Sequence, residues 1–360
     1  MGAVTHGRSS LPEHILDMDA NASGTCWIPG LVSVVIPTRD AEQYIGATLD
    51  SIGAQSYRDW EVIVVEDGPA GPSRDIVTAF AARFPGHRVD YSHHPRSLGP
   101  SAARNTALAR ATGEFVALLD SDDRWLPSHL SRSVDQLRHT GADVVYSTAI
   151  MVDDKTDIPI GIWGPSIHEL RIFPQALFSR STITPSATVF RRQILADVGP
   201  WDTSLRYAED FSFWMNCVRA GKTFAHLGGV HCLYRKNHGA ALTRNMSRTV
   251  TVFAEVAERY LQYALPGTRA KWSRRMVAEV YRLAATAHAT IDRRIDPSAD
   301  RRQAARLAWR GWKLHRRRIF LLCLAGKFAV AALFSRRSAA LAGTAESRPE
   351  NRQVGRLKAA

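Results

Sequence analysis

Three short runs of apolar residues, separated by stretches with helical spacing, dominate the first third of the chain. The runs at residues 31–36, 60–65 and 115–119 have the length and composition of buried strands. Residues 41–54 and 73–84 place apolar side chains at the period of an amphipathic helix. Strand, helix and strand at this spacing predict parallel βαβ units. We therefore expect an α/β fold, with a Rossmann-like open and mostly parallel sheet flanked by helices.

The pattern continues after residue 85 with shorter and less regular elements. We expect strands at 89–92, 143–146, 187–190 and 228–234, and helices at 100–111, 127–140, 191–198 and 207–220. Residues 150–180 contain several Gly and Pro residues and no clear period, which predicts an irregular loop that covers a cleft.

Polar and acidic residues follow directly after the expected strands. The strand at 115–119 stops at Asp120-Ser121-Asp122-Asp123, the strand at 60–65 at Glu66-Asp67, and the first strand at Pro37-Thr38. In an open α/β sheet, ligands bind at the carboxyl ends of the strands, and clustered carboxylates repel one another unless a cation neutralises them. Mg²⁺ or Mn²⁺ binds such oxygen ligands together with substrate phosphates. The alternative is a solvated acidic turn that caps the next helix.

Two further segments carry candidate chemistry. A Gly99-Pro100 turn opens a helix of small residues, with Arg96 and Arg104 nearby, and the free N–H groups of such a helix start can hold phosphate. A structural loop with solvated arginines explains the same residues. Glu209-Asp210 opens the amphipathic helix at 207–220, where an acid is either a general base aimed into a cleft or a partner of the helix dipole.

Five segments, taken in order, resemble the family 2 glycosyltransferases, which are inverting enzymes with the GT-A fold. The segments are VSVVIPTRD, VIVVEDG, GPSAARNTALARATGEFVALLDSDD, VGPWDTSLRYAEDFSFW and YRKNHGAALT. Each is weak alone, but their order and spacing over residues 31–243 make the resemblance specific. One departure is that the second segment reads Glu66-Asp67-Gly68-Pro69 where the family often has Asp-Asp-Gly-Ser.

The resemblance implies roles for individual residues. Pro37 and Thr38 would lie against the nucleoside, and Asp67 would accept a hydrogen bond from the base. Arg96, Arg104 and Asn105 would lie near the nucleotide and its diphosphate. Asp120 and Asp122 would form the DxD motif and hold the metal, with Asp122 as the main metal ligand and Asp123 beside it. Asp210, beside Glu209, would be the base, and His238 would contact the metal or diphosphate unless it is an ordinary surface residue.

The same resemblance implies the reaction and its partners. A nucleotide-diphosphate sugar, most often a UDP-sugar, would donate one sugar to a glycan or lipid-linked acceptor with Mn²⁺ or Mg²⁺. The Gln-x-x-Arg-Trp motif of processive synthases does not follow Asp210, which favours one transfer per encounter. An inactive nucleotide-sugar-binding protein and a nucleotidyltransferase remain alternatives, although the chain lacks a Gly-rich phosphate loop followed by Lys.

Charge and composition divide the chain into expected parts. Residues 1–30 are polar, lack the apolar core of a secretory signal and are expected to be a flexible leader. A catalytic domain would span 31–245, with a nucleotide-sugar-binding part at 31–123 and an acceptor-side part at 124–245. Residues 246–360 would form a helical, basic region, interrupted at Pro266-Gly267 and Asp296-Pro297.

The excess positive charge lies at the end of the sequence. Residues 301–360 hold fifteen Lys and Arg against two Glu, which accounts for the whole net charge of +13. An apolar stretch at 319–334 is shorter than the ~20 residues that span a bilayer. We expect this region to lie on an anionic membrane surface or to pack on the catalytic domain, and we expect no nucleic-acid partner, since that would leave the acidic strand ends without a purpose.

The four cysteines form no CxxC pair, which favours a reducing compartment. Together with the basic tail, this predicts a cytoplasmic protein at the inner face of the cell membrane.

Overall fold

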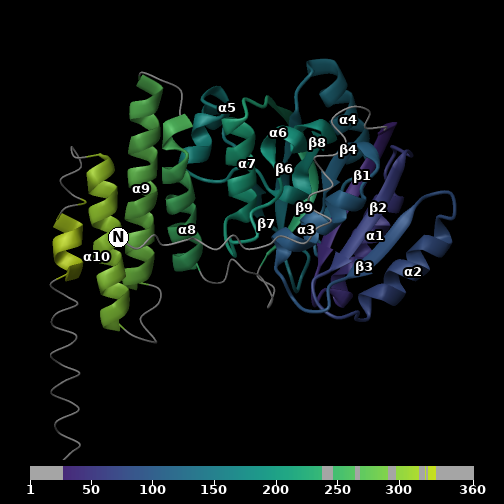
Figure 1. The fold of residues 1–360 in the computed structure, drawn as a ribbon, viewed down its shortest axis with the longest axis horizontal. Helices are drawn as coiled ribbons and strands as arrows, with labels where there is room; N and C mark the ends of the chain where they lie inside the picture. The colour runs from purple at the N-terminus through teal and green to yellow at the C-terminus, as the bar shows by residue number, and fades with distance from the viewer. Residues whose placement is uncertain are drawn as a thin grey trace, which may run out of the picture. The chain divides into compact units, whose positions relative to one another are not determined.

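The computed structural model describes residues 27–236, 246–263, 268–290, 297–315, 321 and 323–329. His238 lies outside the described residues. The chain divides into two compact units (Figure 1). The first combines the residues up to Leu177 with Ser181–Leu242, and the second combines Phe178–Arg180 with the residues from Thr243 onward.

The first unit is built on a nine-stranded mixed sheet. Its strands are β1 (Ile28–Thr38), β2 (Trp60–Glu66), β3 (Val89–His93), β4 (Gly113–Leu118), β5 (Arg124–Trp125), β6 (Val144–Asp153), β7 (Pro159–Trp163), β8 (Thr188–Arg191) and β9 (Phe224–Lys236). They lie in the order β3-β2-β1-β4-β8-β6-β9-β5, and β7 pairs with β6. Strands β3, β2, β1 and β4 run parallel, whereas β8 is antiparallel to both β4 and β6.

Helices cover this sheet because its central strands are apolar on both faces. They are α1 (Glu42–Gly53), α2 (Ser73–Arg83), α3 (Pro100–Arg110), α4 (His129–Thr140), α5 (Ile167–Arg171), α6 (Leu195–Val198) and α7 (Glu209–Arg219). Ile45 of α1 and Leu130 of α4 pack in one core cluster with Val34 of β1 and Val62 of β2. The predicted strands, helices and parallel βαβ units of residues 31–140 are therefore confirmed.

The expectation of an irregular loop at 150–180 is wrong for much of that segment. Strand β6 continues to Asp153, and the chain turns back through Asp157, which has a left-handed φ of 56°, into β7. Ile158, Ile160 and Ile162 alternate with other residues and are exposed, as in an edge strand that presents one face to solvent. Pro and Gly at 159 and 161 obscured this alternation, and both positions are tolerated because β7 pairs on one side only.

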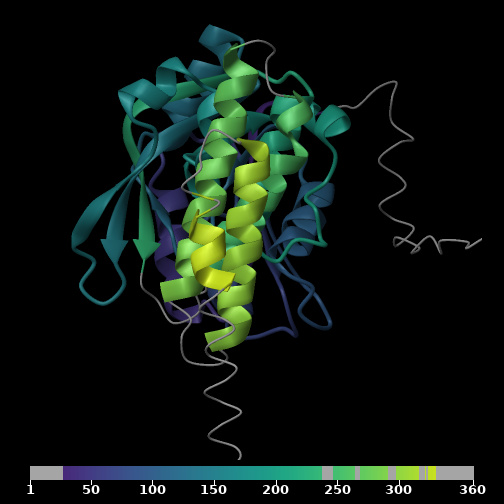
Figure 2. The same cartoon turned by 90° about the vertical axis from the view of Figure 1, so that its left-hand side faces the viewer.

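Among the described residues of the second unit (Figures 1 and 2), helix α9 (Thr268–Thr290) packs side by side with both α8 (Met246–Arg259) and α10 (Pro297–Leu314). These helices begin and end near the predicted interruptions. At Gly311 a Cβ would come within 2.9 Å of the Tyr281 Cβ, so glycine allows α10 to approach α9 closely. No helix among the described residues is long and apolar enough to span a membrane.

Candidate active site

The parallel strands bring three predicted site residues to one edge of the sheet. Thr38 ends β1, Asp67 follows β2 and Asp120 follows β4, and these strands are direct neighbours. The Asp67 backbone N–H donates to the Thr38 carbonyl at 2.8 Å, which fixes the two strand ends together. The grouping of polar strand ends that the sequence predicts is therefore present.

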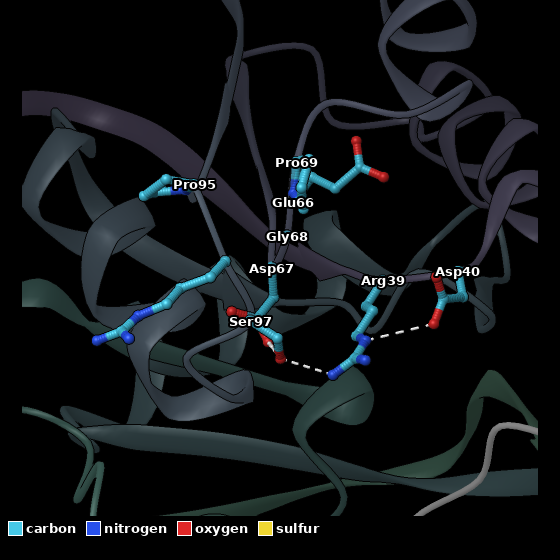
Figure 3. Close-up of a pocket in the computed structure, with 9 residues that line it drawn as sticks. Arg39, Asp40, Glu66, Asp67, Gly68, Pro69, Pro95 and Ser97 are labelled. Atoms are coloured by element: carbon cyan, nitrogen blue, oxygen red, sulfur yellow. Dashed lines mark hydrogen bonds and ion pairs between the residues drawn. The ribbon is translucent and has the colours of Figure 1, made fainter.

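A pocket of about 350 Å³ opens at the ends of β1 and β2 (Figure 3). Asp67 and Arg96 line it, together with Arg39, whose guanidinium donates to the Ser97 hydroxyl at 2.6 Å. The buried Thr38 hydroxyl has no hydrogen-bond partner among the described residues. Pro37 precedes it and is partly buried. Neither Thr38 nor Pro37 is among the residues that line the pocket, so their contact with a nucleoside stays a prediction.

The Asp67 carboxylate organises the loop that forms one wall of this pocket. It accepts hydrogen bonds from the His94 ring at 3.0 Å, the Leu98 N–H at 2.7 Å, the Ser97 hydroxyl at 2.7 Å and the Gly99 N–H at 2.9 Å. Burial favours the protonated acid, but these hydrogen bonds outweigh it and lower the pKa of Asp67. Since a carboxylate offers about four acceptor sites, a base could bind Asp67 only by displacing or sharing one of them.

Arg104 is buried at the centre of the site and joins its two sides. Its guanidinium donates to Asp120 Oδ1 at 2.7 Å and to Glu209 Oε1 at 3.1 Å, and it lies 4.6 Å from the centre of the Trp201 ring. Burial alone would lower its pKa, but the two carboxylates outweigh this effect and raise it. Arg104 is therefore permanently charged and connects the end of β4 with the start of α7.

Asn105 also joins distant segments. Its side-chain amide donates to the Trp201 carbonyl at 2.9 Å and accepts from the Trp201 N–H at 2.8 Å. This reciprocal pair anchors the segment before α7 to α3. The predicted contact of Asn105 with the nucleotide stays a prediction, and in the structure its amide supports Trp201.

Glu209 and Asp210 form the first turn of α7, after Ala208 in a left-handed conformation with φ of 56°. The Asp210 carboxylate accepts from the Phe211 N–H at 2.7 Å. Burial raises the pKa of Asp210 to about 7, and the Glu209 charge adds to the rise, while the Phe211 hydrogen bond and Arg104 oppose it. A carboxyl with this pKa is suited to act as a general base near neutral pH.

The acidic turn after β4 places Asp122 and Asp123 beside Asp120. The Thr48 hydroxyl of α1 contacts the carbonyls of Ser121 and Asp123 at 2.9 and 2.8 Å. Burial, together with the charges of Asp122 and Asp120, raises the pKa of Asp123 well above its usual range. The Asp123 Oδ2 atom is buried and has no hydrogen-bond partner among the described residues.

These features fit a divalent cation. No group of three or more His, Cys, Asp or Glu side chains within the described part of the chain is arranged to hold a metal by itself. Mg²⁺ and Mn²⁺ do not need such a group, since they usually bind one or two carboxylates and the phosphates of a substrate. The half-buried Asp122 and the repulsion among the three neighbouring carboxylates match that donor set.

Several residues near the site were missed by the sequence reasoning. Arg235 and Lys236 end β9, and the Arg235 N–H donates to Asp123 Oδ1 at 2.8 Å. Lys236 Nζ donates to the Tyr234 hydroxyl at 2.7 Å and lies 5.4 Å from the centre of the Trp163 ring. The basic pair within YRKNHGAALT was the available signal, but its meaning depends on β9 ending beside the acidic turn.

Comparisons with known proteins identify the family. Residues 33–199 match the model of Glycosyl transferase family 2. Over 212 residues the chain is 31% identical to a protein of Bacillus subtilis named "Putative teichuronic acid biosynthesis glycosyltransferase TuaG"; the match covers 58% of this chain and 79% of TuaG. The chain belongs to glycosyltransferase family 2.

This family 2 glycosyltransferase has a second informative relative. It is 26% identical over 202 residues to WfgD of Escherichia coli, named UDP-Glc:alpha-D-GlcNAc-diphosphoundecaprenol beta-1,3-glucosyltransferase, and covers 75% of that protein. Both relatives are named as glycosyltransferases, WfgD with a diphosphoundecaprenol-linked acceptor and TuaG with teichuronic acid biosynthesis. The predicted family and enzyme class are thus confirmed.

Solved structures show the GT-A fold. The family 2 glycosyltransferase superposes on S. aureus TarS 1-349 in complex with UDP-GlcNAc with a TM-score of 0.60 at 19% identity, over 86% of this chain and 92% of that one. It spans 52% of a longer TarS structure. The mannosyltransferase PcManGT from Pyrobaculum calidifontis, in complex with GDP-Man and Mn²⁺, matches with a TM-score of 0.51 at 19% identity.

Proposed function

We propose that this glycosyltransferase transfers one sugar, with inversion, from a UDP-sugar to a hydroxyl of a glycan or lipid-linked acceptor. Asp210 carries the proposal, because it is a carboxyl with a pKa of about 7, and its neighbour Glu209 is joined through Arg104 to Asp120 at the acidic end of β4. The names of TuaG and WfgD support a role in cell-surface polysaccharide or glycolipid biosynthesis.

Asp210 is proposed to remove the proton of the acceptor hydroxyl as its oxygen attacks the anomeric carbon. The bond to the acceptor forms on one face of the sugar while the bond to the diphosphate breaks on the other, which inverts the anomeric configuration. Glu209 does not touch the acceptor in this scheme; its charge keeps the pKa of Asp210 high, and its carboxylate is held by Arg104. A general base of this kind contributes typically ~10²–10⁴ in rate.

The donor is proposed to bind at the ends of β1, β2 and β4. Thr38 and the pocket beside Arg96 would take the nucleoside and diphosphate, with Pro37 against the base and Asp67 holding the wall of the pocket. Lys236 would face the departing diphosphate: it is half-buried, burial lowers its pKa, and it forms no ion pair with a carboxylate within the described residues.

Asp122 would hold Mn²⁺ or Mg²⁺, with Asp120 beside it and His238 as a further contact to metal or diphosphate. The cation would supply Lewis-acid neutralisation of the charge that grows on the diphosphate. One oxygen of the Asp120 carboxylate, Oδ1, accepts a hydrogen bond from Arg104, and this bond holds the carboxylate in place at the end of β4.

The second unit is proposed to bring the enzyme to the cytoplasmic face of an anionic membrane, where lipid-linked acceptors are found. Trp309 of α10 is 42% exposed, its ring lies 4.9 Å from that of Trp312, and Lys313 lies over it. Aromatic and basic side chains together are typical of helices that lie in a membrane interface. In flotation assays, Trp309→Ser should reduce binding to phosphatidylglycerol vesicles, while phosphatidylcholine vesicles should bind neither protein.

Replacing Asp210 with Asn tests the proposed reaction. The variant should bind UDP as the wild type does, by calorimetry with Mn²⁺, but should lose at least ~10²-fold in sugar transfer to a prenyl-diphosphate-linked acceptor. Asp75→Asn is the matched control, since Asp75 is an exposed acid in the first turn of α2. Transfer that survives in Asp210→Asn would exclude Asp210 as the base.

The donor class can be determined separately. UDP-, GDP- and dTDP-sugars, each with and without Mn²⁺, should be compared for thermal stabilisation of the protein, because a ligand that binds only the native state raises its stability. We expect the largest, metal-dependent rise with a UDP-sugar. An absence of stabilisation by every donor would favour a degenerate site without transferase activity.

A further inference from the structure

The Arg235 side chain contacts two segments that the sequence places far apart. Its Nε donates to the Asp122 carbonyl at 3.2 Å, its Nη1 to the Asp154 carbonyl at 3.2 Å, and its Nη2 to Asp157 Oδ1 at 3.3 Å. The guanidinium also lies 5.0 Å from the centre of the Tyr44 ring. Only 10% of this side chain is exposed, so the contacts are shielded from solvent.

One of the contacted segments is the acidic turn. Its backbone is held from α1 by the Thr48 hydroxyl and from β9 by Arg235. The Arg235 backbone N–H binds Asp123 Oδ1 as well, and this bond survives any substitution of the side chain. The side chain therefore adds a specific restraint at Asp122, the residue proposed to hold the cation.

The other segment is the turn between β6 and β7. Asp154 accepts from the Tyr44 hydroxyl at 2.7 Å, and Asp157 pairs with both Arg124 and Arg235. These contacts hold the turn in place beside the acidic residues. Arg235 thus connects the Asp122 backbone with a segment that is itself fixed in several directions.

We propose that Arg235 is a positioning residue that fixes Asp122 in the geometry required to bind the divalent cation, by tying the Asp122 backbone to the β6–β7 turn. The inference rests on the proposed metal site. A planar guanidinium can satisfy three acceptors in fixed directions, which a lysine ammonium on a flexible stem cannot reproduce. Groups that orient a metal ligand typically change metal affinity by ~10–100-fold when they are removed.

The sign of the effect separates this role from simple electrostatics. Arg235 is a cation close to the proposed metal site, so removing its charge should strengthen Mn²⁺ binding if only charge matters. Loss of a positioning contact should weaken Mn²⁺ binding instead. Arg235→Gln therefore distinguishes the two effects by direction, and Arg235→Lys tests geometry while the positive charge is kept.

The experiment measures Mn²⁺ affinity by electron paramagnetic resonance with saturating UDP and no acceptor, on the full chain. We expect about tenfold weaker Mn²⁺ binding in both Arg235→Gln and Arg235→Lys, with UDP affinity in EDTA unchanged. Arg124→Gln is the control, because Arg124 pairs with Asp157 on the same turn, whereas Arg235 also donates to the Asp122 carbonyl. Its Mn²⁺ affinity should equal that of the wild type.

The outcomes separate the possible failures. Wild-type protein that binds no Mn²⁺ with UDP would refute the proposed metal site itself. If the wild type binds Mn²⁺, the positioning role alone would be refuted by two results together. Arg235→Gln would bind Mn²⁺ as tightly as the wild type or more tightly, and Arg235→Lys would bind it as tightly. An equal loss in Arg124→Gln would show that the turn as a whole, not Arg235, determines the geometry. If Arg235→Gln does not fold, Arg235→Lys and Asp157→Asn provide the same comparison, with a smaller loss expected for Asp157→Asn.

Discussion

The charges around Asp210 predict opposite shifts in the pH dependence of catalysis. Its pKa of about 7 is raised by burial and by Glu209, and it is held down by Arg104. Glu209→Gln removes the neighbouring negative charge and leaves an amide oxygen that can still accept from Arg104. Arg104→Met removes the positive charge and leaves Asp120 and Glu209 without their shared partner.

The magnitude follows from the fraction of Asp210 that is ionised. A carboxyl with a pKa of about 7 is about one-tenth ionised at pH 6, so kcat/KM of the wild type should fall roughly tenfold from its plateau there. A single nearby charge moves a carboxyl pKa by roughly one pH unit or more. Glu209→Gln should then be about half-ionised at pH 6 and retain about half of its own plateau activity.

The assay is kcat/KM against pH between 5 and 9, with each variant normalised to its own plateau. We expect the acid limb to move down by about one pH unit in Glu209→Gln and up by about one in Arg104→Met. Arg104→Lys keeps the charge and should leave the limb near its wild-type position, even if the plateau falls. Shifts of the same sign in Glu209→Gln and Arg104→Met, or a wild-type limb near pH 4, would refute the assignment.

Three further predictions concern other parts of the first unit. Burial lowers the pKa of His129 to about 3 from an ordinary 6.5, so between these pH values the unfolded chain binds a proton that the folded chain does not. When the pH falls from 6.5 to 4, the free energy of unfolding should therefore fall by about 3 kcal/mol more in the wild type than in His129→Phe. Urea titration at the two pH values measures this difference. Asp122→Asn should abolish the Mn²⁺-dependent part of the thermal stabilisation by UDP, and an unchanged Mn²⁺ effect would place the metal elsewhere. Each Asp67 oxygen accepts from a backbone N–H, of Leu98 or of Gly99, so in either orientation Asp67→Asn places an amide N–H against an N–H, and UDP affinity should fall about tenfold by calorimetry; unaltered affinity would show that the Asp67 hydrogen bonds to the loop are not needed for binding.

The sheet edge that carries the site was predictable because its signal is local. Each apolar strand ends abruptly at a polar residue, and parallel βαβ topology places Thr38, Asp67 and Asp120 together whatever the rest of the chain does. The edge strand β7 was missed because the residues at 159 and 161 are Pro and Gly, whose usual meaning is a loop.

The hydrogen bonds and ion pairs within the site were not predictable, because they join residues that are far apart in the chain. The place of Arg104 near the diphosphate stays a prediction, and its contacts with Glu209 and Trp201, about a hundred positions further on, could not be read from the sequence. Asn105 is similarly engaged by the Trp201 backbone. Arg235 shows the same principle, since its partners at Asp122, Asp154 and Asp157 become neighbours only when β9 pairs with β6.

The left-handed backbone at Ala208 has a consequence for protein engineering. A residue with a Cβ pays roughly 1–2 kcal/mol to adopt this conformation, and glycine would adopt it freely. A stability-driven redesign would therefore select glycine at this position. The same change would widen the range of directions in which α7 can start, and the orientation of the Asp210 carboxyl would then be less well defined. Position 208 is thus a place where thermostability and turnover are expected to trade against each other, and a library screened for melting temperature alone would tend to lose activity there.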